Sequence, residues 1–409
     1  MNNLDKTEPH LRFPEFKGKW ELQKLQKIAK VSSGGTPSRA KSNYWNGNIP
    51  WVSTTLIDFN TILESNEFIT DDGLTNSSAK LFPKGTLLMA MYGQGKTRGK
   101  VALLGIEATT NQACGAIIPN NDKLNELFLF QNLAGRYDEI RDLSNQGGQE
   151  NLSGEIIKNI SVTIPTLPEQ IKIATFLTAV DEKLQALKQK KTLLEQYKKG
   201  VMQQIFSQEL RFKDDNGNDF TDWEEKKLGD VCKTAKSGGT PTSTKREYYN
   251  GNIPFLSISD MTSQGKYLNY TSNHISKLGL DNSASWIVPA YSIIYSMYAS
   301  VGFVAINNIP LATSQAVLNL ILKEGINTDF IYYTLVDFQK KIAQFVTTGT
   351  QGNLNAQSVK GFEIQIPCLK EQTKIANFLS TIDDKINHCQ SQIVNTEVWK
   401  KGLLQQMFI

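Results

Sequence analysis

The sequence predicts an α/β (α+β) protein built from one strand-rich module that occurs twice, with each copy closed by a long helix. Two motifs carry the repeat: Ser-Gly-Gly-Thr-Pro stands at 33–37 and again at 237–241, and Gly-Asn-Ile-Pro stands at 47–50 and again at 251–254. A third motif, Glu-Gln followed by Ile-Ala and Phe-Leu, begins at Glu169 and returns at Glu371. Two similar surfaces in one chain are suited to bind two similar sites, so this pseudo-two-fold repeat indicates a duplicated or bipartite target.

Length and composition indicate two ordinary globular domains. The 409 residues exceed what one hydrophobic core usually serves and suit two domains of roughly 150–200 residues. The chain is 40% hydrophobic and 21% charged, and its mean hydropathy is −0.33. No apolar run approaches the ~18 residues of a membrane helix, and the first residues lack the apolar stretch of a signal peptide. We therefore expect a cytoplasmic protein with no membrane partner.

The cysteines argue against a metal-binding protein, and the charge distribution bears on a nucleic-acid partner. No Cys-x-x-Cys pair occurs and only three histidines are present, which favours reduced, mostly buried thiols and no metal site or disulfide framework (Cys114, Cys232, Cys368 and Cys389). The net charge of +4 and the pI of about 8.6 are compatible with a nucleic-acid partner but do not by themselves indicate one. Residues 80–100 carry basic and no acidic side chains, whereas the matching stretch 283–306 carries no charge.

Each copy opens with the same signals, namely Leu-Arg-Phe and then a tryptophan (11–13 and Trp20; 210–212 and Trp223). Asn-Gly pairs at 46–47 and 250–251 are hairpin-turn signals, and the aromatic residues around them are expected to be core and strand anchors rather than base-stacking groups. These features predict the beginning of a globular domain in each copy.

The remainder of each domain is predicted to be a mixture of short strands and helices. Apolar runs at 87–92 and 293–298 alternate with Gly- and Asn-rich turns, which is typical of strands. Apolar residues that recur every three or four positions predict helical pieces at 124–141 and 328–345.

Two stretches of about 40 residues that follow the domains are predicted to be long helices. Pro168 at the start of the first suits the first helical turn, because its missing N–H would be unpaired there. In both stretches apolar residues follow a sustained 4-3 spacing, the period of helices that supercoil around one another. The seam positions are Ile173, Leu177, Val180, Leu184 and Leu187 in the first helix and Ile375, Leu379, Ile382, Ile386 and Ile393 in the second.

The two helices are expected to pair with each other as an antiparallel coiled coil. At ~1.5 Å per residue each is ~60 Å long, which exceeds a domain of this size, and each follows its own domain in the chain. The alternative is two surface helices, each packed on its own domain. Polar residues that interrupt the stripes are expected to fix the register (Lys191, Lys198, Thr396 and Lys400). The predicted segments are a first domain at 1–165, the first helix at 166–209, a second domain at 210–367 and the second helix at 368–409.

This order of motifs resembles the specificity (S) subunit of type I restriction–modification systems. The resemblance covers nearly the whole chain and includes the Glu-Gln-x-x-Ile-Ala-x-Phe-Leu helices, which end in Lys-Gly-(Val/Leu)-(Met/Leu)-Gln-Gln-(Ile/Met)-Phe. It implies that each half is a target recognition domain that reads one part of a split double-stranded DNA site. It also implies that the paired helices set the spacing and dock two methyltransferase (M) subunits, through which two translocase–nuclease (R) subunits join. S-adenosylmethionine, ATP and Mg²⁺ are then expected in partner subunits and no cofactor in this chain.

The two Gly-rich loops are candidate DNA contacts. Such loops let the backbone approach a phosphate closely, although a plain tight turn is the alternative. Basic neighbours suit phosphate contact, which positions a protein without specifying sequence. The candidates are Gly34, Gly35, Thr36, Ser38, Arg39 and Lys41 in the first half and Gly238, Gly239, Thr240, Thr242, Lys245 and Arg246 in the second.

The basic stretch 92–100 is the candidate base-reading loop of the first half. It lacks the first glycine of a nucleotide-binding loop, because Ala90 stands there, and the matching stretch 298–302 has no lysine. In the major groove Arg or Lys reads guanine and Gln reads adenine. The candidates are Tyr92, Gln94, Lys96, Thr97, Arg98 and Gln112 in the first half, the neutral residues Tyr298, Ser300, Thr313 and Gln315 in the second, and Gln149 and Gln351 in the loops that precede the long helices.

Motifs for chemistry are missing from the sequence. It contains no Asn/Asp-Pro-Pro-Tyr/Phe segment, no glycine fingerprint for S-adenosylmethionine and no carboxylate–lysine cluster at nuclease spacing. We therefore expect a non-catalytic DNA-recognition scaffold. The alternatives are a stand-alone or orphan DNA-binding module and a catalytic nuclease or methyltransferase, which the missing motifs disfavour.

Overall fold

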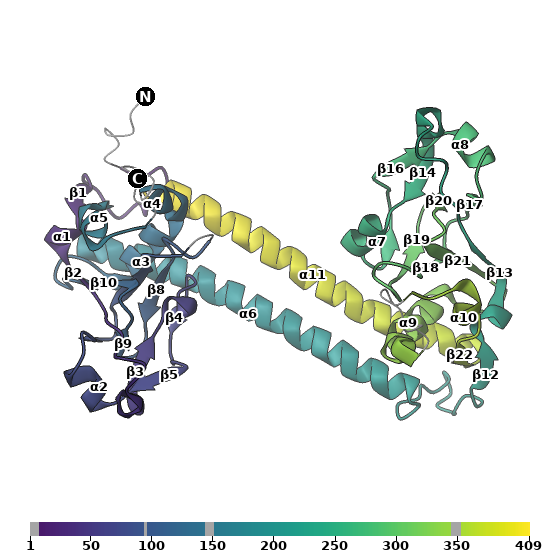
Figure 1. Cartoon of the computed structure of the whole chain (residues 1–409), viewed down its shortest axis with the longest axis horizontal. Helices are drawn as coiled ribbons and strands as arrows, with labels where there is room; N and C mark the ends of the chain where they lie inside the picture. The colour runs from purple at the N-terminus through teal and green to yellow at the C-terminus, as the bar shows by residue number, and fades with distance from the viewer. Residues whose placement is uncertain (1–7, 94–95, 144–150, 345–352) are drawn as a thin grey trace. The chain divides into compact units, whose positions relative to one another are not determined.

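The computed structural model describes residues 8–93, 96–143, 151–344 and 353–409, which form two compact units. Unit 1 contains residues 1–188 and 391–409, and unit 2 contains residues 189–390. The long helices α6 (Leu167–Phe206) and α11 (Leu369–Met407) are each divided between the units (Figure 1). Two similar strand-rich domains with two long helices confirm the predicted fold class. The units differ from the predicted segments, because each joins a globular domain to parts of both helices.

Unit 1 contains two main sheets and a short two-stranded one. The five-stranded sheet has the order β2-β10-β7-β8-β4, the four-stranded sheet has the order β5-β3-β9-β6, and β1 pairs with β11. The elements in chain order are β1 (Glu21–Lys24), α1 (Leu25–Ile28), β2 (Ala29–Ser33), η2 (Ser42–Tyr44), β3 (Trp45–Val52), η3 (Thr54–Leu56), β4 (Thr61–Ile62), β5 (Glu67–Ile69), α2 (Asp71–Thr75), β6 (Leu81–Phe82), β7 (Leu87–Ala90), β8 (Val101–Leu104), β9 (Ala108–Thr110), β10 (Cys114–Pro119), α3 (Glu126–Gly135), α4 (Tyr137–Asp142), α5 (Gly154–Asn159) and β11 (Ser161–Ile164).

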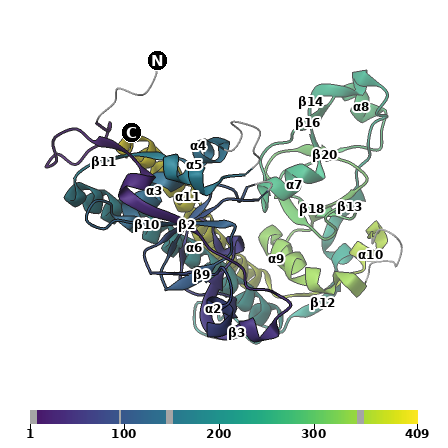
Figure 2. The ribbon, with the colours of Figure 1, turned by 60° about the vertical axis from the view of Figure 1, so that its left-hand side comes forward.

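Unit 2 repeats this topology with the orders β13-β21-β18-β19-β15, β16-β14-β20-β17 and β12-β22. Figures 1 and 2 show its four-stranded sheet beside α8 at one end of the domain, and its five-stranded sheet near α9. The elements are β12 (Glu224–Lys227), η5 (Leu228–Val231), β13 (Cys232–Ser237), η6 (Arg246–Tyr248), β14 (Tyr249–Leu256), α7 (Ile258–Gln264), β15 (Tyr267–Leu268), β16 (Asn273–Ile275), α8 (Lys277–Asp281), β17 (Ile287–Val288), β18 (Ile293–Ser296), β19 (Val304–Asn307), β20 (Leu311–Thr313), β21 (Val317–Leu322), α9 (Thr328–Phe338), η7 (Gln339–Gln344), α10 (Ala356–Lys360) and β22 (Glu363–Ile366).

The central strands of the five-stranded sheets are covered on both faces, which explains their uninterrupted apolar sequence. In β7, Leu87 and Met89 pack in one hydrophobic cluster and Leu88 and Ala90 in another. This alternation follows from the two-residue period of a strand. β7 and its counterpart β18 confirm the strands predicted at 87–92 and 293–298.

The helical pieces predicted inside each domain are also present. The first is interrupted at Arg136, which separates α3 from α4, and the second consists of α9 and η7. The side chains of Asn125 and Asn327 cap α3 and α9 and accept hydrogen bonds of 2.9 Å from the backbone N–H groups of Phe128 and Phe330. Such caps satisfy donors that have no partner within the helix.

The Asn-Gly pairs do not form the predicted hairpin turns. Asn46 and Asn250 lie inside β3 and β14 with φ of 62° and 57°, and each begins a bulge in the pairing with the neighbouring strand. Asparagine tolerates a positive φ, and an extra residue on one strand bends it locally. A Cβ on Gly47 would lie 2.4 Å from the carbonyl oxygen of Ile69, so only glycine fits beside the neighbouring strand.

The two long helices run antiparallel, as predicted. In unit 1, Asp181 and Lys188 of α6 form ion pairs of 2.5 and 2.8 Å with Lys400 and Glu397 of α11, so that ascending α6 corresponds to descending α11. Unit 2 repeats the first pair, because Lys198 of α6 contacts Asp383 of α11 at 2.5 Å. Lys198 and Lys400, which interrupt the apolar stripes, therefore each meet an aspartate of the other helix.

Each long helix begins on its own domain and ends in the core of the other copy. Val201 and Ile205 at the end of α6 belong to the hydrophobic core of unit 2, and Leu403 and Met407 at the end of α11 belong to that of unit 1. This packing excludes the alternative of two helices packed only on their own domains. Of the predicted seam, Leu184, Leu187 and Ile386 are half-buried, and the buried positions are Ile173, Leu177, Val180, Ile375, Leu379, Ile382 and Ile393.

The Glu-Gln motif that opens each long helix is a buried anchor. Glu169 is 1% exposed and accepts two hydrogen bonds from the Arg12 guanidinium, at 2.7 and 2.8 Å, and one from Trp20 Nε1 at 3.3 Å. The hydrogen bond to Glu169, strengthened by its charge and opposed by burial, raises the pKa of Arg12. Gln170 accepts from the backbone N–H of Asn125 and so joins the helix start to the cap of α3.

Unit 2 contains the same anchor. Arg211 donates to Glu371 at 2.7 and 2.9 Å, and Trp223 Nε1 donates at 3.1 Å. Gln372 accepts from the backbone N–H of Asn327 at 2.8 Å. Each domain is thus anchored on its helix by three features that both copies share: the arginine of the Leu-Arg-Phe segment, the following tryptophan and the Glu-Gln motif.

None of the helices in the described part of the chain combines the length and the apolar character that a membrane span requires.

Candidate nucleic-acid interface

Three loops of each unit leave the five-stranded sheet at the same edge. In unit 1, the end of β2 at Ser33 pairs with Gly115 of β10, and Cys114 pairs with Ala90 at the end of β7. β8 starts beside the end of β7, because Val101 pairs with Met89. The topology therefore brings together the loops 34–41, 91–100 and 111–113 in unit 1 and 238–245, 297–303 and 314–316 in unit 2.

A threonine–glutamine pair joins two of these loops in both units. Thr36 Oγ1 donates to Gln112 Oε1 at 2.5 Å, and Thr240 Oγ1 donates to Gln315 Oε1 at 2.7 Å. Gln112, Thr240 and Gln315 are exposed, and Thr36 is half-buried. Each pair occupies the amide oxygen of the glutamine and leaves its NH₂ group for an outside acceptor. The structure thus unites candidates that lie some 75 residues apart in the sequence.

The paired glycines hold the loop against the neighbouring sheet and do not face solvent. Gly34, Gly35, Gly238 and Gly239 are buried, which corrects their assignment as direct phosphate contacts. A Cβ on Gly34 or Gly238 would lie 2.1 or 1.8 Å from the carbonyl oxygen of Thr110 or Thr313. The N–H groups of Gly35 and Gly239 donate to the same two oxygens at 2.8 and 2.9 Å.

Thr313 is also corrected as a candidate DNA contact. It is fully buried at the end of β20, and its hydroxyl accepts from Asn319 Nδ2 at 2.8 Å. A threonine without solvent-accessible surface has no path to a DNA base in this fold. Its role is to receive the loop glycine through its carbonyl group.

Gly238→Ala is expected to destabilise unit 2 by about 1–3 kcal/mol, because the added methyl group overpacks a site that has no room. The same substitution at Gly402, where nothing lies within 4 Å of the added Cβ, should stabilise α11 by up to about 1 kcal/mol. Chemical denaturation of the two variants measures the change in unfolding free energy and its sign for each. Equal shifts in the same direction would contradict the packing role of Gly238.

The basic candidates near the glycine loops are held by aromatic partners. The guanidinium of Arg39 lies 3.7 Å from the ring centroid of Trp45 and forms an ion pair with Glu67. Lys41 Nζ donates to Tyr44 Oη at 2.8 Å, and Lys245 repeats this contact with its own tyrosine at 3.1 Å. The hydrogen bond with Tyr248 raises the pKa of Lys245. Ser38, Thr242 and Arg246 are exposed beside them.

The basic loop of unit 1 connects β7 to β8. Tyr92 and Lys96 are exposed, Thr97 and Arg98 are half-buried, and the backbone carbonyl of Lys96 accepts from Tyr137 Oη at 2.6 Å. In unit 2 the corresponding loop exposes Tyr298 and Ser300, and Ser300 has a φ of 52°. The candidates Gln94, Gln149 and Gln351 lie outside the described residues.

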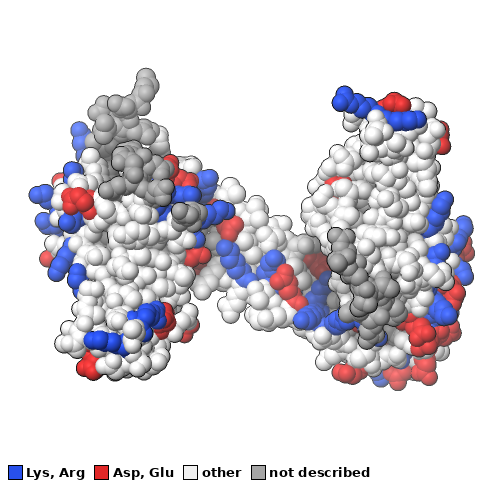
Figure 3. Space-filling view, in the orientation of Figure 1, with Lys and Arg blue, Asp and Glu red and all other residues white. Residues whose placement is uncertain are grey.

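The two units carry different charge on this edge. Residues 282–322 of unit 2, which include two of its three edge loops, contain no charged side chain. In the view of Figure 3 the body of unit 2 shows a broad uncharged face. Unit 1 has Lys96 and Arg98 in the matching loop, so the two units offer different chemistry to a ligand.

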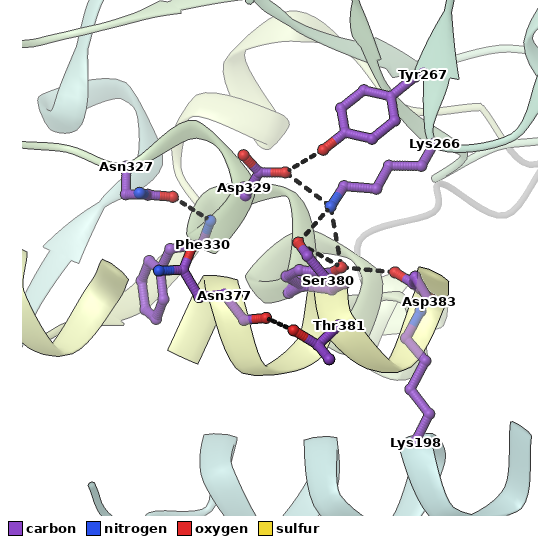
Figure 4. Close-up of polar contacts among 11 residues, drawn as sticks. Lys198, Lys266, Tyr267, Asn327, Asp329, Phe330, Asn377, Ser380, Thr381 and Asp383 are labelled. Atoms are coloured by element: carbon purple, nitrogen blue, oxygen red, sulfur yellow. Dashed lines mark hydrogen bonds and ion pairs between the residues drawn. The ribbon is translucent and has the colours of Figure 1, made fainter. Parts of the chain in front are cut away.

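A half-buried polar cluster in unit 2, built around the buried Tyr333, was not foreseen from the sequence (Figure 4). Lys266 Nζ lies 2.7 Å from Asp329 Oδ1, 2.9 Å from Tyr333 Oη and 3.0 Å from Ser380 Oγ. Tyr333 also donates to Asp383 at 2.6 Å, and burial together with this bond raises the pKa of Tyr333. The cluster ties the segment before β15 to α9 and α11.

Unit 1 has a shorter version of this cluster. There Gln131 takes the place of the tyrosine and donates to Asp181 at 2.7 Å, and Asp181 contacts Lys400. The lysine at the edge strand is replaced by Asn60. No local pattern signals these contacts, because their members come from segments far apart in the chain.

The described residues contain no group of three His, Cys, Asp or Glu side chains placed to hold a metal ion. Burial raises the pKa of the Cys114 thiol to about 12 and that of Cys232 to about 11. These two thiols therefore stay protonated at neutral pH, as expected for structural cysteines.

Comparison with known proteins agrees with the repeat. Residues 17–196 and 221–396 match the model of the type I restriction modification DNA specificity domain. The specificity subunit of the type I restriction enzyme MjaIX from Methanocaldococcus jannaschii is 31% identical over 50% of this chain and 48% of its own length, and that of EcoR124I/EcoR124II from Escherichia coli is 29% identical over 42% and 43%. The chain thus spans about half the length of these two relatives. The MjaVIII specificity subunit is 22% identical over 96% of this chain and 92% of its own length.

Two solved structures share the fold. The S subunit of a type I restriction–modification system from M. genitalium has a TM-score of 0.61 at 16% identity and covers 98% of this chain and 99% of its own. A chain from a study of complex assembly and conformational transition of the type I system has a TM-score of 0.59 at 17% identity, with 95% and 97% covered. With both of its halves matched by the domain model, this chain belongs to the type I restriction–modification DNA specificity family.

Proposed function

We propose that this chain is the DNA-recognition subunit of a type I restriction–modification complex and does no chemistry of its own. In this proposal it reads a bipartite site on double-stranded DNA, with one unit for each half. One observation carries the proposal. Both units bring three loops together at the same edge of the five-stranded sheet, and these loops share the Thr–Gln pair but differ in charge. A repeated scaffold with different loop chemistry suits two half-sites of different sequence.

The helices supply the surface proposed for two methyltransferase subunits, through which two translocase–nuclease subunits would join. α6 exposes Leu193 (56%) and Tyr197 (53%), and α11 exposes Val398 (67%) and Trp399 (48%). Tyr197 and Trp399 occupy matching positions of the repeat. Large apolar side chains on the solvent side of a helix indicate a partner surface, and their repetition supports one methyltransferase subunit on each helix.

Exchange of residues 11–160 for those of a relative with another target tests the proposal. The complex with its methyltransferase subunits should then methylate a site in which one half has changed, while the other half and the gap stay the same. Base-resolution mapping of methylated adenines reads both halves at once. A simultaneous change in both halves would refute independent reading, and absence of methylation at any bipartite site would refute the proposed function.

Val398→Asp is expected to weaken capture of the methyltransferase subunit while leaving the chain folded. The residue is largely exposed, so the change in unfolding free energy should stay within about 0.5 kcal/mol. Asn395→Asp adds the same charge at an exposed, polar position of α11 and is the matched control. Size-exclusion chromatography of the mixed subunits measures the difference, and equal capture by both variants would count against this surface.

Lys96→Ala is expected to weaken binding of the complex to all duplex sequences. Loss of one phosphate contact should lower the slope of log affinity against log salt by about one. Lys84→Ala is the control, because Lys84 is also exposed but precedes β7 at the opposite edge of the sheet. Fluorescence anisotropy at several salt concentrations measures the slope of log affinity against log salt for both variants. Identical slopes would show that this loop does not contact the DNA.

A further inference from the structure

Unit 2 contains an open pocket beside its glycine loop that the contacts described above do not use. The pocket has a volume of about 350 Å³, within the ~300–1,000 Å³ range of small-ligand sites. The half-buried Tyr249 and Phe255, which is 8% exposed and also packs in a hydrophobic cluster of the sheet as expected for a strand anchor, supply aromatic walls. Asn250, Asn273 and His274 supply polar groups. Tyr249 Oη donates to the carbonyl of Pro241 at 2.6 Å, which fixes this wall to the loop.

The same place in unit 1 is filled from within. There the Arg39 guanidinium lies 3.7 Å from the ring centroid of Trp45 and 5.0 Å from that of Trp51, and it forms an ion pair with Glu67. The guanidinium thus lies over the ring of Trp45, close to the ring of Trp51 that meets Trp45 nearly at right angles, and it pairs with a strand carboxylate. Unit 1 shows which kind of group this architecture accepts: a planar one that bears N–H donors.

Strand register identifies the residues that differ in unit 2. Trp51 pairs with Glu67 across β3 and β5, as Phe255 pairs with Asn273 across β14 and β16. The carboxylate of unit 1 is therefore an amide in unit 2. Arg39 matches Ser243, two residues after the proline of the glycine loop in both copies. Unit 2 therefore has neither a counterpart of the Arg39 guanidinium nor one of the Glu67 carboxylate, but it has aromatic walls at the matching positions.

The polar groups favour a neutral occupant over a cationic one. No pocket-lining residue is a carboxylate, and the exposed cations Lys245 and Arg246 shortly precede Tyr249 in the chain. The amides of Asn250 and Asn273 both donate and accept hydrogen bonds, which matches the edge of a nucleobase. Aromatic side chains stack on unpaired bases in many nucleic-acid-binding proteins.

We propose that this pocket binds an unpaired nucleobase of the DNA that unit 2 contacts. The inference rests on the proposed function, since it takes DNA as the ligand. Unit 1 is closed to such a base by Arg39, so only one half of the bound DNA would place a base in the protein. The matched positions of the two units allow the occupant to be installed in one and removed from the other.

The chain has only three histidines, so histidine labelled with ¹³C gives one ring signal from His274 and two internal controls, His10 and His388. The full chain is titrated with a mixed-sequence single-stranded oligonucleotide that contains 2-aminopurine. We expect the His274 signal, assigned with His274→Gln, to shift while the other two stay, and we expect the 2-aminopurine fluorescence to be quenched by stacking.

Ser243→Arg combined with Asn273→Glu installs the unit 1 occupant in unit 2. This variant should lower the affinity for the probe about tenfold, the order of one stacked base. Asn273→Leu, which removes the amide without adding a guanidinium, should also weaken binding and keeps the test valid if the double variant misfolds. Arg39→Ser combined with Glu67→Asn should open the pocket of unit 1 and add a second binding site for the probe.

Two results would overturn the pocket assignment. In the first, argininamide shifts the His274 signal and the oligonucleotide leaves it unchanged. This result would show that the pocket takes an arginine side chain of a protein. An unshifted His274 and unquenched 2-aminopurine would show that no base enters. Duplex binding by the complex with its methyltransferase subunits is measured in parallel: if it persists, the pocket proposal fails alone, and if it is absent, the proposed function fails as well.

Discussion

Replacement of Glu371 by alanine is expected to lower the free energy of unfolding of unit 2 by about 3 kcal/mol. Glu371 has no exposed surface and accepts from both Arg211 and Trp223. Its loss leaves a guanidinium and an indole N–H without their acceptor, and breaking a buried pair from one side typically costs about 3–5 kcal/mol. The lower end applies because the Arg211 side chain is 23% exposed and reaches water.

Two controls separate the anchor from a general effect of charge. Glu397→Ala removes a carboxylate of the same helix whose ion pair with Lys188 is exposed, and it should cost less than about 1 kcal/mol. Glu169→Ala removes the matching anchor of unit 1. It should lower the free energy of unfolding of unit 1 by about as much as Glu371→Ala lowers that of unit 2. Denaturant titration gives the sizes, and hydrogen exchange shows which unit opens. Similar losses for Glu371→Ala and Glu397→Ala would show that the anchor adds nothing beyond a surface ion pair.

Local periodicity explains why the elements could be predicted. The long helices follow from a 4-3 spacing sustained over some 40 residues, and the central strands follow from short apolar runs. Antiparallel pairing followed from chain order alone. The Asn-Gly bulges were missed because the same dipeptide serves a hairpin or a bulge, and only the partner strand decides which. Asn46 lies in the bulge of β3, where Trp45 and Ile49 both pair with Ile69 of β5.

The candidate site depends on contacts that no local pattern encodes. Thr36 and Gln112 were both candidates, but their hydrogen bond requires the strand order that brings β2 beside β10. Thr313 is a candidate DNA contact in the sequence, whereas in the structure it has no exposed surface and its carbonyl accepts from the N–H of Gly239. The Gly-Gly pairs were expected to let the backbone approach a phosphate, and the group that they approach in the structure is the carbonyl of Thr110 or Thr313.

The crosswise packing of the helices could not be predicted, because the apolar stripe is continuous along each helix. The 4-3 spacing continues to Ile205 and predicts that this residue faces a partner, but it leaves open which domain provides that partner. In the structure Ile205 packs with Trp223 and Phe330 in the core of unit 2. The helix that closes the first copy therefore completes the core of the second.

Ile205→Asp is accordingly expected to destabilise unit 2, although the residue lies in the helix of the first copy. Ile205 has no exposed surface, and an uncompensated carboxylate there should cost about 3–5 kcal/mol. Met407→Asp is the reciprocal variant, since Met407 is 2% exposed and belongs to the core of unit 1. Ile205→Val, which keeps the site apolar, should cost about 0.5–1.5 kcal/mol.

Hydrogen exchange followed by mass spectrometry distinguishes the two units in one experiment. In Ile205→Asp, exchange should accelerate in β12, β22 and α9 while β7 and α3 stay protected, and Met407→Asp should give the opposite pattern. If each variant instead opened the domain that precedes its helix in the chain, the helices would pack on their own domains. The spacing role that the resemblance implies for the helices requires the crosswise pattern, because a helix that completes the core of the other copy cannot shift along its partner without exposing that core.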